Sequence, residues 1–280
     1  MSKYPIALTI AGSDSGGGAG IQADIKSFSA NGVYGASVIT AITAQNTVAV
    51  TAIHNVPVDI ITAQLDAVFD DLNITCVKIG MLSKSETIKA VAAVLKKHRA
   101  KNKNLTIVLD PVMVTTTGDP LIADDAVDTL KEVLLPLATL VTPNLHETAR
   151  LINAKLPQSR EEMVDQAQQI LNMGVKAVLI KGGHGASNAA LKESTDLLLL
   201  ADGSKFVEEW FTAKWVVTKN THGTGCSLSS AITANLAKGE TLSSAIQNAK
   251  TWLTGAIASA DDLDVGKGSG PVHHFYQYWK

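Results

Sequence analysis

Residues 220–228 read Asn-Thr-His-Gly-Thr-Gly-Cys-Ser-Leu, and a helix-forming run follows at once over 229–236. Gly223 and Gly225 lack Cβ atoms where the chain would turn into that helix. Successive backbone N–H groups can there converge on one anion, such as a phosphoryl group in transfer, at the positive end of the helix dipole. The same field is expected to lower the pKa of Cys226 and favour its thiolate. The alternative is an ordinary Gly-Thr-Gly turn in which Ser or Thr caps the helix.

The composition indicates an α/β protein. Of the 280 residues, 46% are hydrophobic but only 5% are aromatic, so Val, Ile, Leu and Ala must fill the core, as in sheets buried on both faces. The formal charge of −2 offers no basic surface for nucleic acid, and no run of 18 apolar residues suggests a membrane span. We expect a cytoplasmic location, because the first residues do not form a secretion signal and the cysteine spacing suits neither zinc nor a disulfide framework.

Strand and helix patterns alternate along the chain. Apolar runs predict strands at 4–10, 35–43, 76–79, 105–109, 140–141 and 175–180, and a hairpin at 195–200 and 205–211. Periodicity predicts helices at 21–31, 58–70, 84–99, 123–135, 160–173, 227–237 and 242–260, with Gly174 as a left-handed cap. Short connections without a linker predict one domain over residues 1–280. Its doubly wound, mainly parallel sheet would lie between two helix layers, a three-layer α/β/α architecture.

The distinctive polar groups of the sequence each follow a predicted strand. They are the glycine-rich loop 12–20, Gln45 with Asn46, Asp110, Asn144 with Glu147, and Lys181. In a doubly wound sheet, ligands bind at the carboxyl ends of the strands. We therefore expect these separate loops to meet at one edge of the sheet.

A cleft with an anion site, carboxylates and a lysine suits phosphoryl transfer, which depends on positioning and charge neutralisation. Asp110 and Glu147 are the natural ligands for Mg²⁺, directly or through water, because Mg²⁺ prefers hard oxygen atoms. Lys181 could contact a nucleotide phosphate. Taken singly, each residue has a simpler interpretation: Asp110 as a turn former before proline, Glu147 as a solvated acid and Lys181 as a surface lysine.

The glycine-rich loop does not indicate a dinucleotide site. Residues 18–23 fit Gly-x-Gly-x-x-Ala loosely, but no acidic residue ends the next strand, where such a site needs one for the ribose. The gap between strand and glycines is also too long for a tight turn. No Gly-x-x-x-x-Gly-Lys-Ser/Thr motif occurs, which excludes a P-loop protein.

Gln45 indicates the class of substrate. Its amide presents a donor beside an acceptor, which matches a ring nitrogen next to an exocyclic amine. Asp24, one turn into the first helix, could face the same pocket, and Met81 could form an apolar wall. A polar strand end, a helix-surface acid and a core methionine are the respective alternatives.

The motifs together resemble the hydroxymethylpyrimidine/phosphomethylpyrimidine kinases of thiamine biosynthesis, members of the ribokinase-like superfamily. The resemblance runs nearly end to end and includes residues 11–24, 43–47, 110–113, 142–144, 181–184, 220–226 and 268–272. The first motif and the cysteine-bearing motif are the most specific. The others recur among related vitamin kinases.

The resemblance implies phosphorylation of 4-amino-5-hydroxymethyl-2-methylpyrimidine, and then of its monophosphate, by ATP with Mg²⁺. It implies a ring pocket lined by Gly12, Asp24, Gln45 and Met81. It also implies an anion hole and catalytic group made of Gly223, Gly225, Cys226 and Lys181, with nucleotide contacts from Asn144, Lys181 and Thr224 and metal contacts from Asp110 and Glu147. Relatives commonly form homodimers. A lid at residues 114–118 is a further expectation.

Cys226 stands where most sugar kinases of the superfamily carry Asp as a base. In the second step the acceptor phosphate is already ionised, so no base is needed, and a neutral cysteine would not repel it. Two alternatives remain for the function. One is a pyridoxal/pyridoxine kinase of the same fold, against which Gln45 argues, and the other is a non-catalytic vitamin-binding protein.

Overall fold

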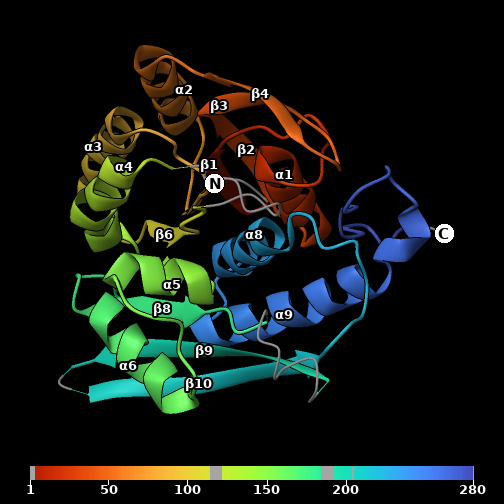
Figure 1. Ribbon diagram of the computed structural model, residues 1–280. Coiled ribbons are helices and arrows are strands. Elements are labelled where there is room, and N and C mark those ends of the chain that lie inside the picture. The colour runs from red at the N-terminus through yellow and green to blue at the C-terminus, as the bar shows by residue number, and fades with distance from the viewer. Residues whose placement is uncertain (1–3, 114–121, 184–191, 204, 280) are drawn as a thin grey trace.

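A computed structural model describes residues 4–113, 122–183, 192–203 and 205–279. Within these residues, one sheet of eight strands crosses the molecule in the order β10-β9-β8-β7-β6-β5-β1-β2 (Figure 1). The six strands from β2 to β8 in this order are parallel, and β9 and β10 are antiparallel additions. Their bounds are β1 Ile6–Ala11, β2 Tyr34–Ile39, β5 Cys76–Ile79, β6 Thr106–Leu109, β7 Leu140–Val141, β8 Ala177–Ile180, β9 Glu193–Asp202 and β10 Lys205–Lys214. The predicted mainly parallel sheet and its terminal hairpin are confirmed.

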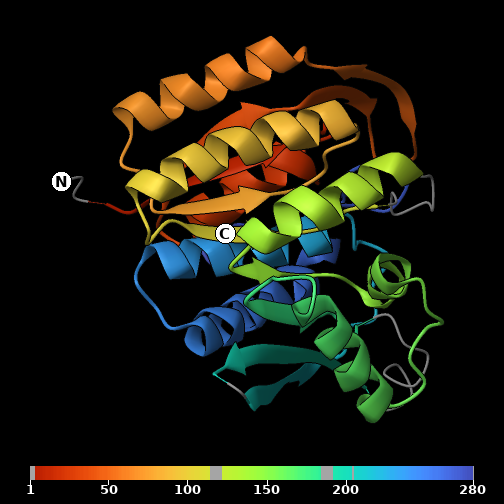
Figure 2. The ribbon, with the colours of Figure 1, turned by 90° about the vertical axis from the view of Figure 1, so that its left-hand side faces the viewer.

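The strands are buried on both faces because helices cover both. One layer holds α1 (Gly20–Ala30), α8 (Thr224–Ala237) and α9 (Leu242–Ala258). The other holds α2 (Val58–Asp71), α3 (Ser85–Lys101), α4 (Asp124–Thr129), α5 (Leu145–Ile152) and α6 (Arg160–Leu171). Figure 2 shows α2, α3 and α4, in orange to yellow-green, running alongside one another across this face. The three-layer architecture is confirmed.

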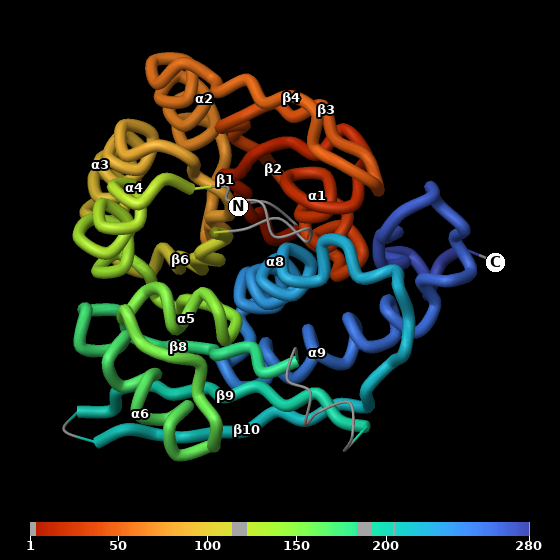
Figure 3. The backbone as a smooth tube through the Cα atoms, in the orientation of Figure 1, coloured from red at the N-terminus to blue at the C-terminus, as the bar shows by residue number. Residues whose placement is uncertain are grey.

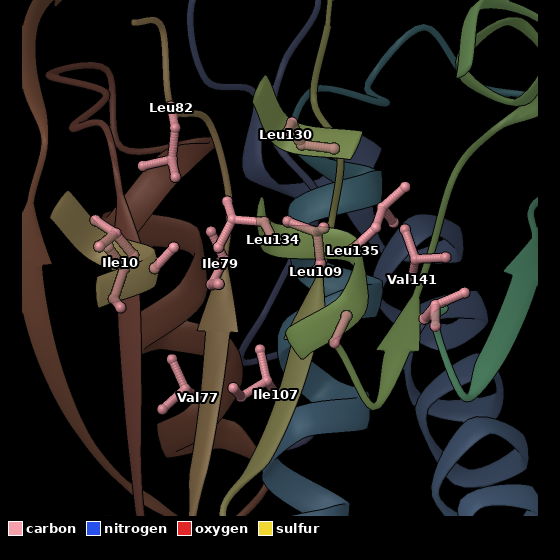
Figure 4. Packing of buried hydrophobic residues seen from close by; sticks show 14 of the residues in the cluster. Ile10, Val77, Ile79, Leu82, Ile107, Leu109, Leu130, Leu134, Leu135 and Val141 are labelled. Atoms are coloured by element: carbon pink, nitrogen blue, oxygen red, sulfur yellow. The ribbon is translucent and has the colours of Figure 1, made fainter. Parts of the chain in front are cut away.

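Alternate residues of each strand pack into different layers. Ile107 and Leu109 of β6 join the core beneath α2, α3 and α4, where Figure 4 shows them beside Ile79 and Leu134. Val108, between them, packs instead with the side chains of α8 and α9. This alternation follows from the two-residue repeat of a strand and explains why the sequence runs are continuously apolar.

The predicted strand at 35–43 is wrong in one respect. The chain leaves the main sheet at Thr40, and β3 (Ala41–Gln45) pairs instead with β4 (Val50–Asn55) in a separate two-stranded sheet. Figure 3 follows the chain from β2 into this pair. Strand β4 was missed because most of its residues are exposed, which leaves no apolar pattern. Gln45 therefore ends a strand of the small sheet, not of the main one.

Two helical segments also differ from the predictions. The expected helix at 123–135 is α4 followed by a π-helical turn (Leu130–Leu134) and a 3-10 turn (Leu135–Leu137). Helix α5 was not predicted, although Asn144 and Glu147 form its capping box. A short 3-10 turn (Ala260–Leu263) follows α9. Gly174 has φ +98°, the expected left-handed cap of α6.

Candidate active site

Three neighbouring strands deliver charged side chains to one edge of the sheet. Asp110 follows β6 and Lys181 follows β8, and their Oδ1 and Nζ atoms are 2.8 Å apart. Glu147, in the first turn of α5 after β7, places Oε2 3.9 Å from the same Nζ atom. The predicted convergence of these loops at the carboxyl ends of the strands is thus present in the structure.

The charges in this group act strongly on one another. Burial by itself would raise the pKa of Asp110, but Lys181 and Lys78 outweigh it, and the pKa is lowered. For Glu147, burial and the nearby charge of Asp110 raise the pKa to about 7 against the effect of Lys181. Burial would lower the pKa of Lys181, yet Asp110 and Glu147 raise it. Lys181 is therefore a fixed cation between an ionised carboxylate and one that titrates near neutrality.

Neighbouring side chains hold Asp110 in place. Thr142 donates to its Oδ1 atom at 3.1 Å, and Ser229 of α8 donates to its Oδ2 atom at 3.2 Å. Asn144 and Glu147 are held by reciprocal capping: Asn144 Oδ1 accepts from the Glu147 N–H at 2.9 Å, and Glu147 Oε2 accepts from the Asn144 N–H at 2.8 Å. The cap directs the Glu147 side chain back towards Lys181.

The N-terminus of α8 faces this charged group. Gly223, the N-cap, has φ +76°, and a Cβ there would collide with the Gly18 carbonyl oxygen. A Cβ on Gly225 would lie 3.3 Å from Lys181 Nζ and 3.8 Å from Asp110 Oδ2, so this backbone lies directly against the ion pair. Thr224 Oγ1 donates to the Thr221 carbonyl at 2.7 Å within its own turn. The first turn of α8 therefore begins directly beside the Lys181 ammonium group.

The expectation of a thiolate at Cys226 is wrong. Burial raises the pKa of the Cys226 thiol to about 11, and the carboxylates of Asp24 and Asp110 add to this. The charge of Lys78 and the Gly20 N–H, which hydrogen-bonds the sulfur, act in the opposite direction but are outweighed. Desolvation is therefore stronger than these two favourable contacts, and the thiol is neutral at physiological pH.

A second group of candidate residues lies around the glycine-rich loop. The methyl group of Met81 packs against Gly12, where a Cβ would approach it to 2.6 Å. Gln45 lies beside His222, with 3.4 Å between Nε2 atoms of the two side chains. His222 directly precedes Gly223, so the structure brings the expected ring-binding residues next to the expected anion hole.

Asp24 occupies a different position from the other ring-pocket candidates. It has no exposed surface, and both its oxygen atoms lie 2.9 Å from Lys78 Nζ. Thr9 donates to its Oδ2 atom at 2.6 Å and Ser230 to its Oδ1 atom at 2.7 Å. In this structure the carboxylate ties β1, β5, α1 and α8 together beneath the site.

Residues near the C-terminus support the same helix. Pro271 forms a β-bridge with His222, and His274 Nε2 lies 2.9 Å from Ser227 Oγ in the first part of α8. Burial lowers the pKa of His274 to about 3, so its ring is neutral. The expected anion-binding turn, residues 221–226, is therefore held from the side of the glycine-rich loop and from the side of the C-terminal segment.

Comparison with known proteins identifies the family. Residues 14–273 match the family described as Phosphomethylpyrimidine kinase. The hydroxymethylpyrimidine/phosphomethylpyrimidine kinase of Rhizobium meliloti (strain 1021) is 54% identical over 275 residues, which cover 98% of each chain. The chain belongs to the phosphomethylpyrimidine kinase family.

Solved structures of similar kinases support the fold. The kinase chain superposes on pyridoxal kinase of Bacillus subtilis, solved as an ADP complex, with a TM-score of 0.85 and 34% identity over 99% of this chain and 100% of that one. Phosphomethylpyrimidine kinase from Clostridium difficile 630 gives a TM-score of 0.76 and 41% identity over 90% of this chain and 99% of that one. The ribokinase-like fold implied by the sequence motifs is thereby confirmed.

Several residues of the kinase site were not singled out from the sequence. Asp14 accepts hydrogen bonds from three backbone N–H groups of the glycine-rich loop and lies 2.8 Å from His222 Nε2. Both residues stood inside recognised motifs, and an acid within a glycine-rich turn is itself a signal for such a bonding pattern. Lys78 and Ser229 gave no signal, because Lys78 is a single polar residue within an apolar strand and Ser229 is one of several serines in a helical run.

Among the described residues, no group of three or more His, Cys, Asp or Glu side chains could hold a metal ion. In the same part of the chain, no helix is long and apolar enough to cross a membrane. The expected lid at 114–118 and His184, the last residue of the motif at 181–184, lie outside the described residues.

Proposed function

We propose that this kinase transfers the γ-phosphoryl group of ATP to 4-amino-5-hydroxymethyl-2-methylpyrimidine and then to the resulting monophosphate, in thiamine biosynthesis. The observation that carries the proposal is the Asp110–Lys181–Glu147 group set against the N-terminus of α8. A phosphoryl group between two anionic oxygens needs fixed cations and N–H donors, and this arrangement provides both. Family membership supports the same reaction.

The proposed roles follow from the positions of the groups. The backbone N–H groups of Gly225 and Cys226 receive the transferring phosphoryl oxygens, with Gly223 turning the chain to aim them. Lys181 neutralises charge on the nucleotide phosphates, because its pKa is raised and it remains protonated. Asn144 and Thr224, at the two helix starts beside Lys181, are proposed to contact the nucleotide.

The carboxylates suit Mg²⁺. Asp110 is buried and ionised, and Glu147 lies on the other side of the same lysine. Magnesium at nucleotide sites takes one or two protein carboxylates and completes its shell with phosphate oxygens and water, so a pair is sufficient. When bound, the ion would neutralise charge on the phosphates. Asp110 and Glu147 would hold it, and Lys181 would shift from the carboxylates towards the phosphates.

Ring recognition is proposed for Gly12, Gln45 and Met81. The Gln45 amide reads the ring nitrogen and the exocyclic amine, while Met81 and Gly12 form an apolar wall. Asp24 is proposed to support the ring pocket indirectly, through its contacts with Ser230 and Lys78. A substrate that contacted Asp24 directly would have to draw it out of this ion pair. A single unit over residues 1–280 is supported by the one main sheet, to which both halves of the chain contribute strands.

Cys226 is proposed to serve the second phosphorylation by being neutral. The thiol, with a pKa near 11, adds no negative charge where the acceptor phosphate must approach. The substitution Cys226→Asp would place an anion there, so the second step should slow by at least about tenfold more than the first. Separate assays of the two steps measure this. Full activity of Cys226→Asp in the second step would refute the role.

The deciding experiment is product analysis after incubation with ATP, Mg²⁺ and the aminopyrimidine alcohol, with pyridoxine in a parallel reaction. Mono- and then diphosphate from the pyrimidine are expected. Turnover of pyridoxine alone would favour pyridoxal kinase, the second candidate, which the similarity to Bacillus subtilis pyridoxal kinase supports. Binding of either ring without product would favour a vitamin-binding protein instead.

A homodimer in the cytoplasm is part of the same proposal. Ile42 and Ile53 of the β3–β4 sheet and Ile60 of α2 are about half exposed, and a second copy could cover them. Analytical ultracentrifugation measures the mass, and Ile42→Asp with Ile53→Lys should shift it to that of one chain. A single-chain mass for the unmodified protein would contradict the dimer.

A further inference from the structure

Thr43 imposes a hydrogen-bonding requirement on Gln45. Its Oγ1 atom lies 2.7 Å from the Ser13 carbonyl oxygen and 3.2 Å from Gln45 Oε1. A hydroxyl has one proton, and the nearer Ser13 carbonyl can only accept it. Thr43 Oγ1 therefore has only lone pairs left for Gln45, and needs a donor there.

His222 imposes the complementary requirement at the other end of the amide. Its Nε2 atom lies 2.8 Å from Asp14 Oδ2 and 3.4 Å from Gln45 Nε2. Burial would raise the pKa of Asp14, but His222 and two backbone N–H groups lower it, so the carboxylate is ionised. An ionised carboxylate can only accept, which places the proton on His222 Nε2. This single proton is directed at Asp14, so the Gln45 amide lies beside the positive end of an N–H dipole, and an amide oxygen is favoured there over an amide nitrogen.

The amide as it stands meets neither requirement, because its oxygen faces an acceptor and its nitrogen faces a donor. A half turn about the last side-chain bond exchanges the two atoms, so that Nε2 donates to Thr43 Oγ1 and Oε1 lies beside the His222 N–H group. We propose that Thr43 and His222 hold Gln45 in this reversed orientation, and that they thereby determine which ring the site accepts. The proposal rests on the proposed function, since it takes Gln45 as the residue that reads the ring.

The reversed orientation of the Gln45 amide fits the aminopyrimidine better than the unreversed orientation does. It places the acceptor Oε1 on the side of His222, next to the anion-binding turn, and the donor Nε2 on the side of Thr43. In the aminopyrimidine, the amine and the hydroxymethyl group occupy adjacent ring carbons. An amine bound to Oε1 therefore leaves the hydroxymethyl group on the side of Gly223, where phosphorylation is proposed. The unreversed amide would turn that group away.

The orientation can be measured without any substrate. In protein labelled with ¹⁵N-glutamine, the side-chain amide signals of Gln45 are assigned by their loss in Gln45→Glu. Nuclear Overhauser contacts from these amide protons to the Thr43 methyl group are expected. Contacts to the His222 ring protons in place of the Thr43 methyl group would overturn the proposal, whether or not the protein is an active kinase.

A matched pair of variants tests the effect on selectivity. Thr43→Val keeps the shape but removes the acceptor, whereas Thr43→Ser keeps the hydroxyl. The ratio of kcat/KM for the 4-amino substrate to that for its 4-oxo analogue should fall about tenfold or more in Thr43→Val and change little in Thr43→Ser. KM for ATP should be unchanged in both. Equal losses on both rings with an unchanged ratio would mean that Thr43 is only structural and would overturn the selectivity claim.

Discussion

Two lysines of this kinase bind carboxylates in contrasting ways. Lys78 and Asp24 have no exposed surface. Both carboxylate oxygens of Asp24 accept hydrogen bonds, from Lys78 and from Thr9 or Ser230. Burial would lower the pKa of Lys78, but Asp24 and other nearby anionic groups raise it, so the pair stays charged. The pair is balanced, with one cation for one anion.

Lys181 instead lies among an excess of negative groups and is partly exposed. Its side chain is 12% exposed, and Asp110 and Glu147 both lie within 4 Å of its ammonium group. Burial and this excess of negative charge together raise the pKa of Glu147. A sealed and balanced pair fastens four elements of the fold, whereas an open and unbalanced group suits the proposed exchange of partners with Mg²⁺ and phosphate.

The largest effect is expected from breaking the sealed pair. Lys78→Met leaves Asp24 buried without its cation, which should lower the free energy of unfolding by about 3–5 kcal/mol. Urea denaturation followed by circular dichroism measures this. The double variant Lys78→Met/Asp24→Leu should recover part of the loss. A change below about 1 kcal/mol in the single variant would show that the pair does not fasten the fold.

Substitution of Lys181, in the open Asp110–Lys181–Glu147 group, should lower activity more than stability. Lys181→Met should lower kcat about 100- to 1000-fold, because charge developing on the phosphoryl oxygens loses its cation. Its unfolding midpoint should fall less than that of Lys78→Met. Lys181→Arg keeps the charge and should retain more activity. Steady-state kinetics with saturating ATP and pyrimidine separate the variants, and equal activity of Lys181→Met and the unmodified enzyme would contradict the role.

A smaller effect is expected from protonation of Glu147. With a pKa of about 7, this carboxyl group becomes neutral as the pH falls through neutrality, so the apparent affinity for Mg²⁺ should weaken below pH 7. Titration of activity against Mg²⁺ at pH 6 and pH 8 measures the change. Glu147→Gln should bind Mg²⁺ more weakly and lose this part of the pH dependence. The same pH profile in both proteins would assign the titration to another group.

The same shift has a consequence for stability. Because the folded pKa lies above the usual 4.5, the folded state holds the proton more tightly than the unfolded state. The contribution of Glu147 to the free energy of unfolding is therefore present below pH 4.5 and is lost as the pH rises to about 7, by on the order of 1–3 kcal/mol. Glu147→Gln should flatten this interval of the stability curve, and no difference between the curves would contradict the shift.

The edge of the sheet could be predicted because local patterns determine it. Buried strands show as apolar runs, and in parallel sheets the residues that follow them must meet, as Asp110 and Lys181 do. The bonds between distant segments could not be predicted in this way. The contact of Asp24 with Lys78, or of Asp14 with His222, depends on how distant segments pack together. A periodic pattern in the sequence does not contain that information.

Cys226 and the β3–β4 sheet show two other limits. The sequence suggested a helix field that would favour a Cys226 thiolate, but the burial that raises the pKa of this thiol depends on the surrounding fold. No Gly or Pro marks the break at Thr40 in the sequence. The turn there is fixed by backbone hydrogen bonds: the Thr40 N–H donates to the Ala11 carbonyl, and the Val56 N–H donates to the Thr40 carbonyl. By contrast, α5 carried its own signal, the spacing of Asn144 and Glu147.

The docking of His274 on Ser227 has a consequence for how the kinase is made. A ribosome that has just released α8 has already produced Asp110, Lys181 and Cys226, but it has not yet produced Pro271 or His274. The two contacts that those residues make with the anion-binding turn are therefore absent from every nascent chain until synthesis has passed residue 274. Completion of the turn proposed to bind the phosphoryl group is in this way linked to translation of the segment that carries Pro271 and His274.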